Sequence, residues 1–206
     1  MIKGFLLFVV IIFVASSAFA QNEQAPIIER DIDFKNWIYK SVRSDEDVNL
    51  RKFAIGKKFV MVVYFAPWCP NWKHDAAFVQ GLYEKYSPNG FEVIGVGEYD
   101  PIAAMKAHLD AYKITFPVVY ESVLRTDKQK TLHYGYRKKT GDTRNWGSPW
   151  YIFLDPSRFE RGELLVSRTS IVNGELIKED AETFIRGKLG LSTEPVEIAD
   201  RRPIEP

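Results

Sequence analysis

Cysteine is almost missing from this chain, which has Cys69 alone among its 206 residues. A single thiol excludes an internal disulfide, and in an oxidising compartment an unpaired thiol is a candidate for pairing with another molecule. His, Asp and Glu residues are scattered, and no spacing of them around the cysteine indicates a metal site. We therefore expect neither a bound metal nor an internal disulfide.

The chain also lacks an excess of either charge. Lys and Arg number 28 and Asp and Glu number 27, and loss of residues 1–20 would remove Lys3 alone, leaving 27 of each. This balance argues against nucleic acid or an anionic membrane surface as a partner. Gly95-Val96-Gly97 lacks the third glycine and the helix start of a dinucleotide-binding motif, so no cofactor is expected.

Long apolar runs are absent apart from the one at the start of the chain. Residues 5–14 are apolar, follow Lys3 and lead to Ala18-Phe19-Ala20. A basic start, a short apolar run and an Ala-x-Ala ending are typical of a secretory signal peptide, here over residues 1–20. The alternative is an uncleaved membrane anchor, although the run is short for a span. We predict an exported protein, periplasmic or extracellular, without stable membrane insertion after cleavage.

The most informative stretch surrounds the cysteine. Residues 60–65 are β-branched and aromatic, which predicts a fully buried strand. The strand breaks at Ala66-Pro67, and a helical pattern begins after Cys69 with Pro70 in its first turn, where a missing N–H is tolerated. The thiol therefore stands at a helix N-terminus, where the helix dipole favours the thiolate.

Hydrophobic patterns around this stretch predict alternating strands and helices. The crossover helices imply parallel strand pairing, and a terminal hairpin implies an antiparallel edge, so we predict an α/β three-layer sandwich with a mixed central sheet. Residues 121–146 show no clear pattern. The expected strands are at 37–42, 60–65, 91–97, 116–120, 150–154 and 163–167. The expected helices are at 70–86, 101–113 and 179–189, and Asp100 is the expected N-cap of the second. Residues 48–53 form either a short strand or one helical turn.

Two segments carry a resemblance to a known family. Tyr64–Asn71 is similar to the aromatic-rich strand and W-C-x-x-C motif of thioredoxin-fold proteins, most like the exported TlpA-like thiol-disulfide oxidoreductases. Gly147–Asp155 resembles the segment that carries the family's cis-proline and the strand after it. The resemblance implies a thioredoxin-like domain over residues 34–190, between a flexible N-terminal segment at 21–33 and a disordered tail at 191–206.

The resemblance also implies roles for individual residues. Cys69 is the expected nucleophile, Pro149 the expected cis-proline, and Ser148 offers its backbone to a substrate strand beside the thiol. Asp75 falls where many TlpA-like proteins carry an acidic residue that is proposed to manage protons. Pro70 flanks the thiol and is expected, with Trp68, Trp72 and Ser148, to contribute to substrate binding.

One departure from the family pattern changes the expected chemistry. Trp72 stands where the second, resolving cysteine belongs. A dithiol enzyme releases its mixed disulfide by attack of that second thiol, so this chain cannot cycle in that way by itself. A small thiol or a partner could resolve the mixed disulfide instead, or redox chemistry could have been lost. For Trp72 itself, packing in the space of the lost thiol is the alternative to ligand contact.

Three functions follow from these residues. The first is a single-cysteine thiol-disulfide oxidoreductase that acts through mixed disulfides with a protein or small-molecule partner. The second is a redox-inactive binding module that holds an extended peptide beside Pro149. The third is a thiol peroxidase, which ranks last because those enzymes need Thr or Ser three residues before the cysteine, where this chain has Ala66. For the tryptophans at 68, 72, 146 and 150, an apolar surface around the thiol and a place in the core both remain open.

Overall fold

The computed structural model describes residues 23–192, so the predicted signal peptide at 1–20 and residues 193–206 of the predicted tail lie outside the described residues. Among the described residues, no helix is both long and apolar enough to cross a membrane. The strands are β1 (Gln24–Ala25), β2 (Ile28–Lys35), β3 (Ile38–Ser41), β4 (Asp47–Asn49), β5 (Phe59–Phe65), β6 (Phe91–Gly97), β7 (Val118–Tyr120), β8 (Trp150–Leu154), β9 (Leu164–Val172) and β10 (Glu175–Leu176). The helices are α1 (Leu50–Phe53), α2 (Pro70–Tyr86), α3 (Ile102–Ala111), α4 (Leu132–Lys139) and α5 (Lys178–Leu189), with short 3-10 turns η1 (Ser87–Asn89), η2 (Arg125–Lys130) and η3 (Pro156–Arg158).

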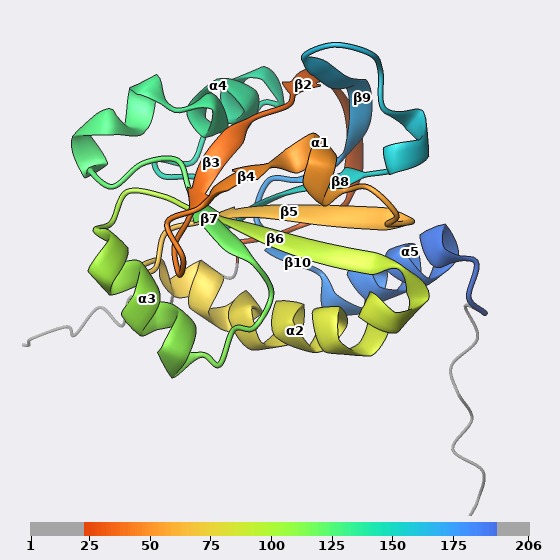
Figure 1. The fold of residues 1–206 in the computed structure, drawn as a ribbon, viewed down its shortest axis with the longest axis horizontal. Coiled ribbons are helices and arrows are strands. Elements are labelled where there is room, and N and C mark those ends of the chain that lie inside the picture. Colours follow the sequence, from red (N-terminus) through yellow and green to blue (C-terminus); the bar gives the residue numbers. More distant parts are fainter. Residues whose placement is uncertain (1–22, 193–206) are drawn as a thin grey trace, which may run out of the picture.

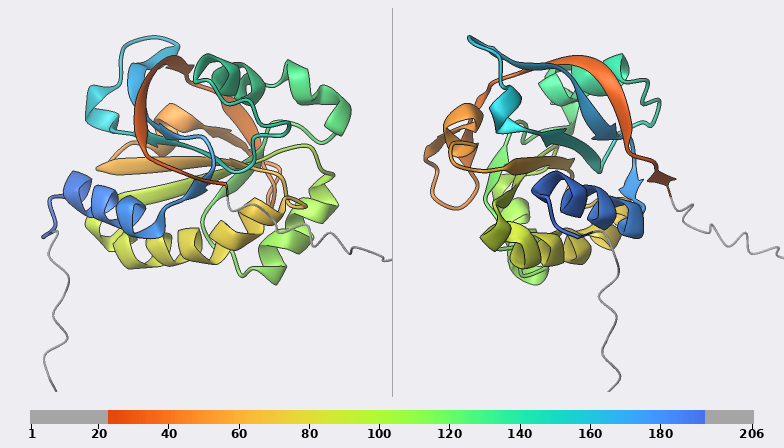
Figure 2. Two further views of the ribbon diagram at one scale, coloured as in Figure 1. Left: turned by 180° about the vertical axis from the view of Figure 1, so that it is seen from behind. Right: turned by 90° about the vertical axis from the view of Figure 1, so that its right-hand side faces the viewer.

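A mixed eight-stranded sheet in the order β2-β9-β8-β5-β6-β7-β3-β4 forms the centre of the molecule. Helices α2, α3 and α5 cover one face, and α1 and α4 lie on the other (Figure 1). Strands β2 and β9 curl away from the sheet centre over that second face, as the side view in Figure 2 shows. The predicted α/β architecture with a mixed central sheet is therefore confirmed.

Strand β5 lies at the middle of the sheet and is buried along its whole length. It pairs in parallel with β6 and antiparallel with β8, so both of its edges are hydrogen-bonded. Because side chains alternate across a strand, Met61, Val63 and Phe65 enter the core beneath α2, whereas Val60 and Val62 enter the core on the opposite face. Burial on both faces explains why this strand is a continuous apolar run rather than an alternating pattern.

The turn from β5 into α2 places the cysteine. Cys69 is the N-cap residue of α2, with extended backbone angles, and Pro70 follows in the first turn as predicted. The Cys69 amide donates to the carbonyl of Ala66 over 2.9 Å, and the Cys69 carbonyl accepts from the Lys73 amide over 3.1 Å. The thiol thus follows the end of a strand that is buried along its whole length.

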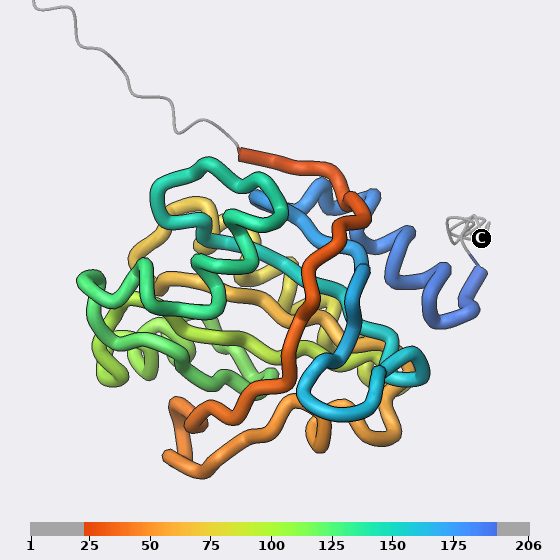
Figure 3. The backbone as a smooth tube through the Cα atoms, turned by 90° about the horizontal axis from the view of Figure 1, so that it is seen from above, coloured from red at the N-terminus to blue at the C-terminus, as the bar shows by residue number. Residues whose placement is uncertain are grey.

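The N-terminal segment differs from the prediction. Residues 21–33 were expected to be flexible, but residues 28–33 belong to β2, which pairs antiparallel with β9 (Figure 3). Ile32 and Phe34 are buried while the charged residues between and before them are exposed. The exposed charged residues of β2 hide the apolar pattern that would predict a strand. Its partner β9 is more than 100 residues away in the sequence, so the strand can be recognised only from this long-range pairing.

Two smaller expectations are also corrected. Helix α3 begins at Ile102 with Pro101 as its N-cap residue, so Asp100 does not cap it. The hairpin after β8 is real, but β8 pairs with the far end of β9, through Tyr151 with Val172 and Ile152 with Ile171. Of the expected partner segment, residues 163–167, Leu164 and Val166 pair with β2 and not with β8. Strand β9 lies between β2 and β8 in the sheet and pairs with both.

Candidate active site

The thiol of Cys69 meets the segment that leads into β8. Its Sγ donates to the carbonyl oxygen of Ser148 over 3.1 Å, and the Ala66 amide donates to Ser148 Oγ over 2.9 Å. The Ser148–Pro149 peptide bond is cis, as the family resemblance implied. Two segments that are 79 residues apart in the chain are thereby joined at the thiol.

A cavity of about 330 Å³ opens beside Cys69. This volume is at the lower end of the range for small-molecule sites, about 300–1,000 Å³. Three of the residues expected at the substrate site, Trp68, Pro70 and Ser148, line it together with the cysteine. Trp146, which the sequence offered for an apolar surface around the thiol, lines the cavity as well. The remaining lining residues, which were not expected at the site, are Glu23, Asn71, Arg144, Asn145 and Gly147.

Trp72 does not belong to this cavity, which corrects its expected place among the substrate-binding residues. Its side chain is completely buried and stacks on Phe65 with ring centroids 4.5 Å apart. Its Nε1–H donates to His108 Nε2 over 2.7 Å. Burial lowers the pKa of His108 to about 4, so its imidazole is neutral at ordinary pH and can accept this bond. The alternative interpretation, that Trp72 fills core space, is what the structure shows.

The four tryptophans near the thiol divide into two pairs. Trp72 and Trp150 are fully buried in the core. Trp68 and Trp146 are half-buried and line the cavity, with their rings edge to face at 5.2 Å. Each of the two interpretations left open by the sequence is therefore correct for one pair.

Asp75 lies on α2 but faces the sheet. Its side chain is buried, and its Oδ2 accepts from Tyr151 Oη over 2.6 Å and from the Leu176 amide over 2.9 Å. Burial raises the pKa of Asp75 to about 6, against the lowering effect of these two hydrogen bonds. The described hydrogen bonds connect this carboxyl to β8 and β10, and none of them joins it to Cys69. The neighbouring His74 is exposed, with Nδ1 3.6 Å from Glu175 Oε2.

Helix α4 supports the cavity wall that contains residues 144–148. His133 and Arg137 lie one turn apart on this helix, share a face and are both fully buried. Arg137 Nη1 donates to the Arg144 carbonyl over 3.0 Å and to Asp142 Oδ2 over 3.2 Å. His133 Nε2 lies 3.1 Å from the Gly147 carbonyl oxygen. Arg137 Nη2 also donates to the Asn145 carbonyl over 3.4 Å, so α4 holds the wall through three of the wall's backbone carbonyls.

The hydrogen bonds of His133 define its tautomer. Burial, with the nearby charge of Arg137, lowers the pKa of His133, so the ring is neutral. The Gly147 carbonyl can only accept, so Nε2 carries the proton and Nδ1 accepts from Tyr99 Oη over 3.0 Å. Gly147 has φ of +58°, and a Cβ there would lie 1.8 Å from Arg137 Nη1. Only glycine allows the guanidinium to pass beneath this wall.

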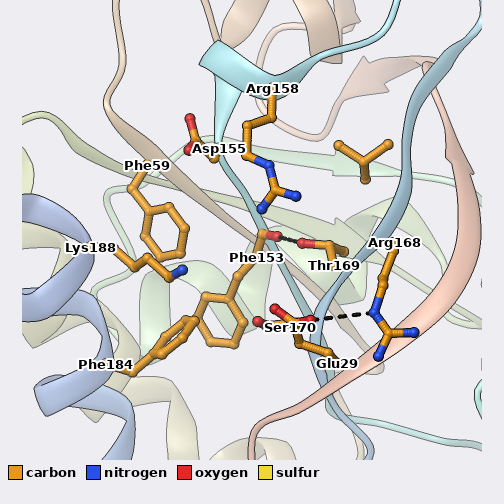
Figure 4. A pocket seen from close by; sticks show the side chains of 11 residues that line it. Glu29, Phe59, Phe153, Asp155, Arg158, Arg168, Thr169, Ser170, Phe184 and Lys188 are labelled. Carbon is orange, nitrogen blue, oxygen red and sulfur yellow. Dashed lines mark hydrogen bonds and ion pairs between the residues drawn. The ribbon is translucent and has the colours of Figure 1, made fainter.

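A second hollow lies at the opposite end of β5, between α5 and β9 (Figure 4). Its volume is about 20 Å³, which is room for about one water molecule. Charged groups around it are partly paired, since Arg168 Nε donates to Glu29 Oε2 over 3.3 Å. This hollow is too small for a substrate, and the cavity at Cys69 is the candidate site because it borders the thiol.

A comparison with protein families places the chain in one of them. The model of the AhpC/TSA family matches residues 23–157, which include the cysteine and the segment that leads into β8. The chain belongs to the AhpC/TSA family.

Curated relatives of this AhpC/TSA chain are similar to it over shorter segments. The thiol-disulfide oxidoreductase ResA of Oceanobacillus iheyensis is 31% identical over 64 residues, which cover 31% of this chain and 33% of the relative. ResA of Halalkalibacterium halodurans is 27% identical over 79 residues, which cover 38% of this chain and 44% of the relative. The matched segments thus span less than half of either relative.

Solved structures establish the fold of this AhpC/TSA member. A thiol:disulfide interchange protein of the thioredoxin family from Chlorobium tepidum has a TM-score of 0.56 at 18% identity, with 78% of this chain and 98% of that chain covered. A secreted thiol-disulfide isomerase from Corynebacterium glutamicum has a TM-score of 0.54 at 15% identity, with coverage of 81% and 86%. The thioredoxin-like fold expected from the sequence is confirmed.

Proposed function

We propose that this protein is an exported thioredoxin-like thiol-disulfide oxidoreductase that acts through Cys69 alone. The observation that carries the proposal is the position of the thiol at the N-cap residue of α2. Cys69 is only 7% exposed and packs in the core beneath α2, but it also borders an open cavity of about 330 Å³. A structural cysteine is also a small buried hydrophobe, so the border with the cavity, rather than exposure, is what favours a functional thiol here. The ResA relatives, by their names, support thiol-disulfide chemistry.

The proposed reaction is thiol-disulfide exchange in two steps. The Cys69 thiolate attacks one sulfur of a partner disulfide, whose S–S bond breaks as the other sulfur leaves as a thiolate. A new S–S bond then joins Cys69 to the partner. Because the chain has no second cysteine, an external thiolate must attack the partner sulfur of this mixed disulfide and release Cys69 as a thiolate.

Other residues have proposed supporting roles. A partner segment would lie along Ser148, which lines the cavity beside the thiol with Trp68 and Pro70. Pro149 is buried outside the cavity lining, and its proposed role is to guide that segment through its cis bond to Ser148. Asp75 is the proposed proton acceptor, because a carboxyl with a pKa of about 6 is ionised at neutral pH and can still take up a proton readily. Its hydrogen bonds to β8 and β10 would orient it.

Export remains part of the proposal. The basic, apolar and Ala-x-Ala pattern of residues 1–20 supports it. A similar solved structure comes from a secreted protein, the Corynebacterium glutamicum isomerase. An oxidising compartment would also supply disulfide partners for a protein that has only one thiol.

The test compares Cys69 in the folded and unfolded protein. Mature protein is incubated with the neutral reagent dipyridyl disulfide, and thiopyridone release is followed before and after unfolding in urea, with Cys69→Ser as the blank. A functional thiol should form its mixed disulfide at least as fast in the folded protein as in the unfolded chain, and added small thiols should release it. Reaction that occurs only after unfolding would overturn the redox proposal.

A redox-inactive peptide-binding module is the second candidate, favoured by the loss of the resolving cysteine to the buried Trp72. In that case Cys69→Ser would bind peptides as tightly as the natural protein, and the thiol would stay unreactive in the folded state. The thiol peroxidase alternative would require sulfenic acid at Cys69 after peroxide treatment, which the proposal does not expect because Ala66 lacks a hydroxyl.

A further inference from the structure

Two cations are held above the tryptophans that line the cavity. The Arg125 guanidinium lies 4.5 Å from the centre of the Trp68 ring, and Lys128 Nζ lies 4.8 Å from the centre of the Trp146 ring. These two rings are in edge-to-face contact and both line the cavity beside Cys69. The cation–π contacts therefore fix two positive charges beside the opening that leads to the thiol.

These charges have neutral partners inside the protein. Lys128 Nζ donates to the amide oxygen of Asn145 over 2.8 Å. Within residues 23–192, no ion pair within 4.0 Å joins Arg125 or Lys128 to a carboxylate, whereas Lys130 on the same turn pairs with Asp127 at 2.9 Å. The Arg125 charge lowers the pKa of the Asp100 carboxyl, but burial has the larger effect and raises this pKa overall. The two cations are thus available to an outside anion.

The segment that contains Arg125 and Lys128 carries an excess of positive charge. Residues 121–146 contain seven Lys and Arg and three Asp and Glu, a net charge of +4, while the whole chain has +1, so all other residues together carry −3. Inside the cavity the charges balance, because Arg144 Nη1 lies 3.4 Å from Glu23 Oε2. Of the seven cations, Arg125 and Lys128 lie over Trp68 and Trp146 and form the rim of the cavity with these rings, whereas Arg137 is buried and Lys139 pairs with Asp33 on β2.

The composition of the rim is that of a protein-binding surface. Trp and Arg are the residue types most often found at the energetic centres of interfaces. Next to Arg125, Leu124 is 55% exposed, which adds apolar surface beside the charges. Long cationic side chains that are already stacked on a ring lose less conformational freedom on binding than free ones.

We propose that the partner that reaches Cys69 is an acidic peptide segment of a protein, which places carboxylates on Arg125 and Lys128 while its sulfur enters the cavity. This inference rests on the proposed function of Cys69 and names the class of partner for that site. The aromatic walls contact the apolar parts of the segment, and the rim cations select its charge. Opposite charges at the rim would also speed the encounter, an effect that salt screens.

The experiment uses three synthetic peptides that differ only in charge. Each carries one cysteine activated as a mixed disulfide with thiopyridine, flanked by Asp and Glu, by Ser, or by Lys. Attack by Cys69 releases thiopyridone, and its rate is measured at low and high salt. We expect the acidic peptide to react about tenfold faster than the basic one at low salt, with the difference shrinking as salt is added.

Charge-reversal variants locate the effect. The double variant Arg125→Glu, Lys128→Glu should invert the order of the peptides. The matched control is Lys52→Glu, Lys188→Glu, which changes the net charge equally at exposed positions on other elements and should leave the order unchanged. All four side chains are at the surface, so these variants should fold.

The outcomes separate this inference from the proposed function. Equal rates for the three peptides, or an order that the rim variant leaves unchanged, would overturn the acidic-partner inference while Cys69 remains reactive. If Cys69 in the folded protein reacts with none of the peptides and not with dipyridyl disulfide either, the proposed function itself fails, and this inference with it.

Discussion

Replacing Asp75 by Asn should stabilise this protein at neutral and alkaline pH. The carboxyl is buried against β8 and β10, and burial raises its pKa from 3.8 to about 6. Its two described partners, Tyr151 Oη and the Leu176 amide, both donate to Oδ2. An Asn carbonyl in the same place can accept both bonds, so the substitution removes the charge and keeps the hydrogen bonds.

The sign and size of the effect follow from the pKa values. Because the folded-state pKa is raised, the folded protein holds the proton more tightly than the unfolded chain does. That contribution to stability is fully present below the unfolded value of 3.8 and is lost as pH rises through about 6. The difference corresponds to about 3 kcal/mol, and allowing for relaxation we expect Asp75→Asn to be about 2 kcal/mol more stable than the natural protein above about pH 7 and similar to it below about pH 4.

The assay is urea unfolding followed by tryptophan fluorescence over this pH range. His108 titrates in the same window with the opposite sign, because burial lowers its pKa to about 4 and its contribution is lost as pH falls. It is present in both proteins, so subtraction removes it. Asp110→Asn, at an exposed ion pair with Arg43, is the control and should change stability by less than about 1 kcal/mol. A stability gain that does not vary with pH, or that is largest in acid, would refute the reasoning.

Two further substitutions test the support of the site and the core beneath it. Gly147→Ala should cost more than about 3 kcal/mol by thermal or urea unfolding, because its Cβ would lie 1.8 Å from Arg137 Nη1. Gly141→Ala, also at positive φ but with no atom within 4 Å, should cost only about 1–2 kcal/mol, and equal losses would contradict the proposed clash. Trp72→Phe should cost about 1–3 kcal/mol because His108 Nε2 loses its buried donor, and an unchanged unfolding midpoint would show that this bond contributes nothing.

Much of the fold could be predicted because many of its strands and helices produce hydrophobic patterns within short segments of the sequence. The apolar run of β5, the turn after it and the periodic apolar positions of α2 lie within one short stretch, and each depends on neighbours in the sequence. The cis peptide at Pro149 was expected from the family resemblance and is present. Strand β2 was missed because its buried residues are few and its partner β9 is distant in the chain.

Less of the site could be predicted, because most of its walls come from distant segments. Residues 121–146 have no periodic apolar pattern, yet α4 within them buries His133 and Arg137. These two side chains hold the backbone of residues 144–147, and no motif marks a residue whose partner is a carbonyl group. The signal that remained visible was the charge of the segment, which is strongly positive in a nearly neutral chain.

The sequence by itself determined the strand-to-helix turn that presents Cys69, since backbone propensity, proline and hydrophobic burial all act locally there. It also determined that no second thiol can resolve a mixed disulfide within the chain. Only the tertiary structure decided that Trp72 faces the core while Trp68 and Trp146 face the cavity. The physical reason is that a side chain's exposure depends on which distant segments pack around it. Those contacts form only when α2 packs against the sheet and α4 holds residues 144–147 in the cavity wall.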